Sequence, residues 1–264
     1  MAEGCWPWAL HLFQVKIKNP GSMRLQSTLF IIAILTCCGN EPESTPLPSD
    51  VDLRILFVGN SLTYTNDLPA LVQELGAKDG IKIEVESLLF PNYSLEDHWN
   101  DGKVQPEIKK GKYDFVIAQQ GPSALPESQV LLLEYATRLA EVCKQANSKL
   151  ALYMVWPSSD RSFDLDNVIY SYTNAAKSTQ SLLCPAGLAW KNAWAKDFSL
   201  PLYSSDDFHP SIMGSTLAAI TIYAALRDKT NLDFIHQSEM SWKKEVSEEK
   251  LALMKQAALQ AIGK

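Results

Sequence analysis

The fold is decided by the stretch Arg54-Ile55-Leu56-Phe57-Val58-Gly59-Asn60-Ser61-Leu62-Thr63. Its uniformly apolar half is typical of a buried strand in a parallel sheet. Gly59 would then allow a tight turn from strand to loop, which leaves the Ser61 hydroxyl exposed. A serine at the mouth of a buried strand is a candidate nucleophile, although Asn60 and Ser61 are also ordinary turn residues.

Strand-like runs alternate with helical patterns through the rest of the chain. Strands are expected at 53–58, 81–87, 113–118, 150–155 and 182–185. Helices are expected at 68–78, 127–145, 166–181, 188–197, 211–227 and 245–262. The strand at 81–87 alternates apolar and charged residues and is therefore expected at an edge. This order predicts an α/β fold with a parallel sheet and helices on both faces.

Polar or aromatic residues follow three of the predicted strands. Ser61 follows the first strand, Gln119 and Gln120 follow the third, and Trp156 follows the fourth. Ligands of open parallel sheets bind at the carboxyl ends of the strands. We therefore expect these residues to lie along one rim.

A second motif, about 145 positions after the first, is Asp206-Asp207-Phe208-His209-Pro210-Ser211. Histidine titrates near neutral pH and suits a general base. Asp206 could accept the hydrogen on Nδ1 of the ring, which would fix its tautomer. Asp207 is the competing carboxylate. Together with Ser61, the motif supplies the parts of a nucleophilic triad.

In this order and separation, the two motifs resemble those of the SGNH (GDSL-type) hydrolase superfamily, where Gly-Asp/Asn-Ser-Leu opens the domain and Asp-x-x-His closes it. The resemblance implies a flavodoxin-like three-layer α/β/α sandwich with a five-stranded parallel sheet in the order 2-1-3-4-5. It implies ester hydrolysis through an acyl-serine intermediate, with Ser61, His209 and Asp206 as the catalytic residues. No metal or organic cofactor is implied.

The blocks between the two motifs depart from the family pattern. The family stabilises the oxyanion with the N–H of the nucleophile, a Gly after strand two and an Asn after strand three. After strand two this chain has no Gly, and Asn92 could stand in because it tolerates left-handed backbone. After strand three Gln120 is favoured, with Gln119 and Ser123 still open, because a Gln amide can donate to an oxyanion. A non-catalytic ligand-binding protein on the same scaffold is the alternative.

Three further residues are candidates for the pocket wall. His98 follows strand two, Tyr64 follows the nucleophile loop, and Trp156 ends strand four. His98 could equally be a surface histidine beside Trp99, and aromatic residues at strand ends also serve as lids on the core. The expected substrates are small acyl esters, O-acetyl groups on carbohydrates in particular; lipid and thioester substrates also fit the fold.

Composition narrows the class of protein. The 264 residues are 46% hydrophobic, and the net charge of −6 argues against a nucleic-acid partner. No apolar stretch in the body of the chain is long enough to span a membrane. Beyond the leader only Cys143 and Cys184 remain, and we expect two buried thiols rather than a disulfide. No Cys/His spacing indicates a zinc site.

The N-terminal region predicts export. Residues 1–22 have no clear role, and we expect translation to begin at Met23. Residues 23–38 combine a basic start, a short apolar core and a small-residue exit, which is typical of a signal peptide. They end in a stretch similar to a bacterial lipobox, so that Cys38 or Cys37 would carry a lipid and anchor the protein in the periplasm or at the cell surface. Simple secretion and a soluble cytosolic form are the alternatives. Residues 39–51 read as a tether and 52–264 as one domain.

Overall fold

One parallel sheet organises the residues that the computed structural model describes, 50–264. The leader, both candidate lipidation sites and most of the tether lie outside them. The strands are β1 (Leu53–Gly59), β2 (Ile83–Leu89), β3 (Phe115–Ala118), β4 (Lys149–Tyr153) and β5 (Leu182–Cys184). They pair in the order β2-β1-β3-β4-β5, all parallel, which confirms the predicted order. β2 lies at an edge, as its alternating pattern predicted.

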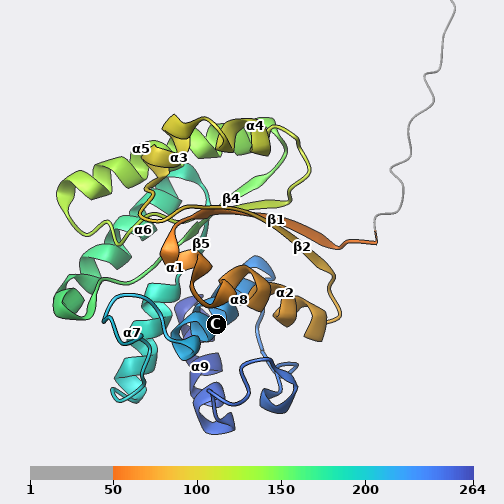
Figure 1. Cartoon of the computed structure of the whole chain (residues 1–264), viewed down its shortest axis with the longest axis vertical. Coiled ribbons are helices and arrows are strands. Elements are labelled where there is room, and N and C mark those ends of the chain that lie inside the picture. The colour runs from red at the N-terminus through yellow and green to blue at the C-terminus, as the bar shows by residue number, and fades with distance from the viewer. Residues whose placement is uncertain (1–49) are drawn as a thin grey trace, which may run out of the picture. The chain divides into compact units, whose positions relative to one another are not determined.

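Helices cover both faces of the sheet, so the predicted three-layer α/β/α sandwich is confirmed (Figure 1). One face carries α3 (Leu95–Asp101), α4 (Val104–Ile108), α5 (Pro126–Gln145) and α6 (Leu165–Thr179). The other carries α2 (Leu68–Lys78), α7 (Ala186–Lys196), α8 (Ile212–Leu226) and α9 (Glu248–Ala261). Short elements are α1 (Ser61–Tyr64) and the 3₁₀ turns η1 (Thr65–Asp67), η2 (Ser159–Asp164) and η3 (Gln237–Glu239).

Most element boundaries match the sequence pattern to within a few residues. The helix predicted at 68–78 is α2, with the Asp67 carboxylate capping it by accepting from the N–H of Ala70 at 3.4 Å. The third strand begins at Phe115 rather than at 113. Its first predicted residue, Tyr113, instead turns its hydroxyl to Glu86 and Glu107, at 2.6 Å from each. These contacts tie the start of β3 to the edge strand and to α4.

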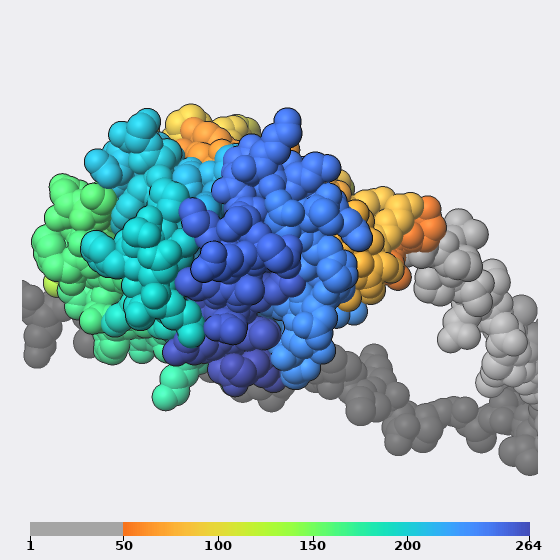
Figure 2. Space-filling view, turned by 90° about the horizontal axis from the view of Figure 1, so that it is seen from below, coloured from red at the N-terminus to blue at the C-terminus, as the bar shows by residue number. Residues whose placement is uncertain are grey.

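The core is formed by the sheet and the inner faces of the helices. Ile55 to Val58 of β1 are fully buried, as expected of a strand with helices on both sides. On the α8 side, the ring of Trp156 stacks on that of Trp190 at 3.4 Å between centroids. Figure 2 shows the C-terminal residues, which include α9, packed over this side of the molecule next to α7.

Two predictions about single residues concern this core. Cys143 and Cys184 are buried free thiols, which confirms the prediction against a disulfide. Burial raises the pKa of each thiol to about 12. Between residues 50 and 264 no helix is both long and apolar enough to cross a bilayer.

Candidate functional site

Ser61 lies at the carboxyl end of β1, where the chain leaves the sheet. It is the first residue of α1, and only 8% of it is exposed. Asn60 caps this helix: its side-chain oxygen accepts from the N–H of Leu62 at 3.1 Å, and its Nδ2 donates to the carbonyl of Tyr93 at 2.9 Å. The Asn60 side chain therefore ties the serine turn to the loop after β2.

Gly59 is required in this turn for a reason other than the one expected. Its φ is not positive, so the turn does not demand a glycine backbone. A Cβ there would instead lie 2.6 Å from Oε1 of Gln119 and 2.8 Å from Oγ1 of Thr63. Oε1 of Gln119 accepts from the N–H of Asn60 at 3.0 Å and from Thr63 Oγ1 at 2.8 Å. Glycine makes room for the buried amide that holds the turn.

His98 supports the same turn from behind and does not line the pocket wall. It is 2% exposed, and its Nε2 lies 2.9 Å from the carbonyl oxygen of Gly59. Because a carbonyl only accepts, Nε2 carries the hydrogen. Burial lowers the pKa of this imidazole, in spite of the opposing bond to Gly59. Its neutral form therefore fixes the end of β1.

The rear motif forms an aspartate–histidine pair. Oδ2 of Asp206 lies 2.6 Å from Nδ1 of His209, while Oδ1 accepts from the backbone N–H groups of Phe208 at 3.0 Å and His209 at 2.9 Å. The bond to His209 is the main cause that holds the pKa of Asp206 well below its ordinary value. Asp207 has a φ of 59° and no bond to the ring. Asp206 is therefore the partner of the histidine.

Two side chains, Asn66 and Trp156, hold the histidine loop in place. Nδ2 of Asn66, just after the nucleophile helix, donates to the carbonyl of Pro210 at 3.0 Å and to Ser215 Oγ at 2.9 Å. On the other side, Nε1 of Trp156 donates to the carbonyl of Phe208 at 3.2 Å. Trp156 is fully buried, so it supports the loop from the core and is not the pocket aromatic that was predicted.

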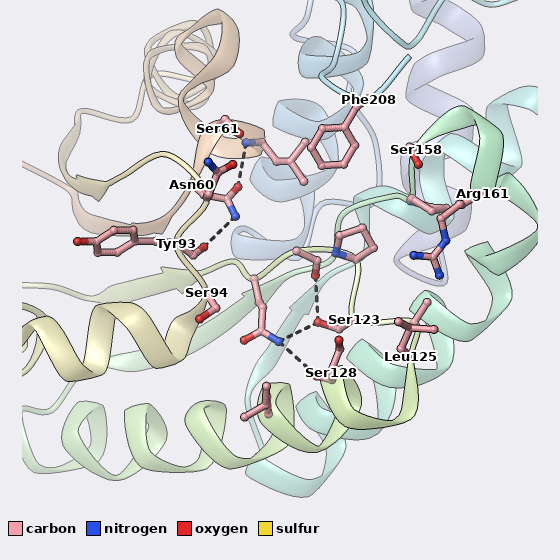
Figure 3. Close-up of a pocket in the computed structure, with 18 residues that line it drawn as sticks. Asn60, Ser61, Tyr93, Ser94, Ser123, Leu125, Ser128, Ser158, Arg161 and Phe208 are labelled. Atoms are coloured by element: carbon pink, nitrogen blue, oxygen red, sulfur yellow. Dashed lines mark hydrogen bonds between the residues drawn. The ribbon is translucent and has the colours of Figure 1, made fainter. Parts of the chain in front are cut away.

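A cavity of about 440 Å³ opens beside Ser61 (Figure 3). Its wall comes from the loops that follow β1, β2, β3 and β4 and from the histidine loop. The lining residues are Asn60, Ser61, Leu62, Asn92, Tyr93, Ser94, Gln120, Gly121, Pro122, Ser123, Ala124, Leu125, Ser128, Leu131, Pro157, Ser158, Arg161 and Phe208. The nucleophile candidate and the residue before His209 thus face one cavity. Within residues 50–264 the Ser61 hydroxyl makes no hydrogen bond, to His209 included.

The structure places the three candidates for oxyanion stabilisation in different surroundings. Asn92 lines the cavity with a φ of 61°, the left-handed backbone for which it was chosen. Gln120 also lines it, but its Nε2 donates to Ser123 Oγ at 2.9 Å and to the carbonyl of Ser128 at 3.3 Å. Gln119 is buried behind the serine turn and is absent from the wall. Of the two glutamines, Gln120 is therefore the one that reaches the cavity wall, and its amide hydrogens already donate to other groups.

Tyr64, predicted for the pocket wall, is 41% exposed and is not among the residues that line this cavity. Sequence reasoning missed the wall formed after β4, where Ser158 and Arg161 line the cavity. A signal existed in the polar run that follows the fourth strand at 158–161, since loops at that end of a parallel sheet carry binding residues.

No group of three His, Cys, Asp or Glu side chains that could hold a metal ion occurs in the part of the chain described.

The same fold occurs in solved structures of other bacterial proteins, some of which are described as hydrolases. A DUF4886 family protein from Bacteroides uniformis matches with a TM-score of 0.66 and 18% identity over 80% of this chain and 94% of that one. A lipase/acylhydrolase from Enterococcus faecalis matches with a TM-score of 0.56 and 14% identity, over 67% and 96%. A protein from Slackia heliotrinireducens, whose proposed assignment is SGNH hydrolase, matches with a TM-score of 0.54 and 23% identity, over 66% and 98%.

No protein-family model matches the sequence, and neither does any curated protein. The identities to the solved structures are low, so the likeness establishes the fold. That fold is the one of the SGNH hydrolases, as the two sequence motifs predicted.

Proposed function

We propose that the protein is a serine esterase that hydrolyses small acyl esters, O-acetyl esters of carbohydrates in particular, through an acyl-serine intermediate. One observation carries the proposal. The carboxylate of Asp206 lies 2.6 Å from Nδ1 of His209, on a loop that Asn66 fastens to the loop of Ser61. A carboxylate, an imidazole and a serine on neighbouring loops of one rim are the components of acyl transfer.

The Asp206–His209 contact defines what the histidine does. The carboxylate accepts the hydrogen on Nδ1, which leaves the lone pair of Nε2 to receive the proton of Ser61. Ser61 Oγ attacks the ester carbon, and the imidazolium then gives its proton to the departing alcohol. A water molecule activated by the same nitrogen attacks the acyl-serine and releases the acid. This requires the Ser61 side chain to meet the ring when substrate binds, a contact that is often long in free enzymes.

The negative charge that develops on the ester oxygen during attack needs hydrogen-bond donors to stabilise it. The backbone N–H of Ser61 makes no hydrogen bond within the described part of the chain, and Ser61 lines the cavity. The backbone of Asn92 lies on the same wall. Gln120 can contribute only after its amide leaves Ser123 and Ser128, so Ser61 and Asn92 are the first donors in this proposal.

The cavity wall favours a small acyl group next to a polar alcohol. Besides Asn60 and Ser61, four serines and two asparagine or glutamine residues accompany the apolar residues on it: Ser94, Ser123, Ser128, Ser158, Asn92 and Gln120. Hydroxyl and amide groups can hydrogen-bond to sugar hydroxyls. An enzyme for long acyl chains, whether a lipase or a thioesterase, would require a long apolar channel, so hydrolysis rates on esters of increasing chain length distinguish these substrates.

Covalent labelling tests the proposal. The protein should react with a fluorophosphonate probe at Ser61 and hydrolyse p-nitrophenyl acetate, and Ser61→Ala should abolish both. Ser178→Ala is the matched control, because Ser178 is exposed on α6 and lies outside the cavity wall. Absence of both labelling and hydrolysis in the folded wild-type protein would favour the non-catalytic binding protein.

We further propose that the protein is exported and anchored through a lipid on Cys38 or Cys37, both outside the described residues. The support is the signal-peptide and lipobox pattern alone. Metabolic labelling of the full chain with a fatty-acid analogue in a bacterial host tests it. Loss of label in one of the single variants Cys38→Ala and Cys37→Ala identifies the modified residue, and an unlabelled wild-type protein in the soluble fraction contradicts the anchor.

A further inference from the structure

The cavity beside Ser61 carries one charged side chain among the described residues that line it, Arg161. All the others are neutral, and no carboxylate reaches the wall. Figure 3 shows the guanidinium across the cavity from Ser61, between Ser158 and Leu125. A ligand whose ester lies at Ser61 would therefore present its other end to Arg161.

A buried carboxylate orients the guanidinium. Nε and Nη2 of Arg161 donate to Oδ2 of Asp164 at 3.0 and 2.5 Å. Asp164 is only 8% exposed, and Asn167 donates to its other oxygen at 3.4 Å. Nη1 of Arg161 makes no hydrogen bond within residues 50–264, and 43% of the side chain is exposed. One edge of the guanidinium is thus held in place while the other is available to a ligand.

The surroundings of that free edge favour a carboxylate on a ring. Figure 3 shows Leu125, which is 43% exposed, and Ser158 on either side of the Arg161 side chain, so an apolar residue and a hydroxyl-bearing residue flank it in the wall. The guanidinium edge matches the two oxygens of a carboxylate. Asp164 balances the charge of Arg161, so the pair creates little long-range field. Arg161 would therefore attract a ligand carboxylate through short hydrogen bonds. Recognition therefore requires a carboxylate within contact distance.

We propose that Arg161 is a specificity-determining residue that binds a carboxylate on the alcohol part of the ester. The substrate class would then be acetyl esters of acidic sugars, uronates, rather than of neutral sugars. This inference rests on the proposed function for the ester at Ser61 but concerns a different part of the cavity.

Three acetyl esters with one ring skeleton test it: phenyl acetate, the anion 4-acetoxybenzoate and the cation 4-acetoxyphenyltrimethylammonium. In the full chain, Arg161→Met should lower kcat/KM for 4-acetoxybenzoate about 10- to 100-fold. The rate on phenyl acetate should stay nearly unchanged, and that on the cation should stay unchanged or rise. Arg138→Met is the matched control, since Arg138 pairs with Glu134 on α5 and does not line the cavity. Equal losses on all three esters would overturn the inference and make Arg161 a structural residue.

A binding measurement separates this inference from the proposed function. Calorimetry on the Ser61→Ala protein should show galacturonate binding at least about tenfold more tightly than galactose, a preference that Arg161→Met removes. If no ester is hydrolysed by the wild-type protein but this preference is found, the esterase proposal fails and the carboxylate site stands. If esters are hydrolysed but galacturonate shows no preference, the esterase stands and the carboxylate site fails.

Discussion

Replacing Asn66 probes how the two halves of the site are held together. Its Nδ2 spans 144 positions of sequence to the Pro210 carbonyl and 149 to Ser215, at 3.0 and 2.9 Å. Its backbone has a φ of 58°, in the left-handed region. Loss of two hydrogen bonds should cost about 1–3 kcal/mol of unfolding free energy. Alanine should cost about 1–2 kcal/mol more, because its Cβ disfavours that backbone.

Glycine is the matched variant for this position. Asn66→Gly removes the amide but adopts a φ of 58° without the steric cost. We therefore expect Asn66→Ala to be the less stable of the two in urea unfolding. Because both variants release the Pro210 loop, kcat on p-nitrophenyl acetate should fall by a similar factor in each, about 10- to 100-fold.

The two readouts can fail separately. If Asn66→Gly keeps the wild-type kcat while its stability falls, the contact holds the fold but does not position His209. If the alanine and glycine variants unfold at the same urea concentration with the same slope, the argument from backbone strain is wrong.

Three further predictions concern the Asp206 carboxylate, the turn at Gly59 and the two buried thiols. Asp206→Asn should lower kcat about 10⁴-fold. The amide oxygen would keep accepting from the backbone N–H groups of Phe208 and His209, so the NH2 group would donate to Nδ1 and hold the ring in the wrong tautomer. Since the pKa of Asp206 is lowered by folding, its stabilising effect is present above its ordinary value of about 4 and lost at lower pH, so the stability gap to the Asn variant should close in acid unfolding. Gly59→Ala would place a Cβ 2.6 Å from a buried amide oxygen and should cost about 1–3 kcal/mol in urea unfolding, whereas Gly121→Ala, with open space around it, should cost little. Burial raises the pKa of the Cys143 and Cys184 thiols to about 12, so both should react with a disulfide reagent only after unfolding. A stability gap that persists in acid, equal costs for the two glycine changes, or a fast thiol reaction in the native protein would contradict the respective argument.

The sequence predicted the fold because the information was local and repeated. A short apolar run such as Ile55 to Val58 indicates a buried strand when similar runs alternate with helical patterns along the chain. The pairing of Asp206 with His209 could also be predicted from the sequence. The two residues are three positions apart, so their contact requires no long-range packing. The strand order came from the family resemblance and was confirmed.

The direction of side chains at the ends of strands was harder to predict from the sequence. Gln119 and Gln120 are adjacent, yet one points into the core behind Asn60 and the other into the cavity wall. Neighbouring residues of an extended chain point to opposite sides, so a shift of one position exchanges their roles. Trp156 turned inward for the same reason, where stacking on another tryptophan buries it completely.

Long-range contacts explain the other differences. His98 looked like a pocket or surface residue, but its role is set by the carbonyl of Gly59, 39 positions away. The need for glycine at that position depends on Gln119, which belongs to another strand end. Arg161 belongs to no recognisable sequence motif, and its relevance arises only because η2 and the loops after β1 and β3 line one cavity. Contacts of this kind depend on tertiary packing, which local patterns do not contain.

The central claim is that Ser61 forms a covalent acyl intermediate. Quenching the full chain in acid during turnover of p-nitrophenyl acetate and measuring peptide masses tests it directly. The peptide that contains Ser61 should carry one acetyl group, with none on Ser94 or Ser128 of the same cavity. Turnover without acetyl on Ser61, or with acetyl on another side chain, would contradict the account.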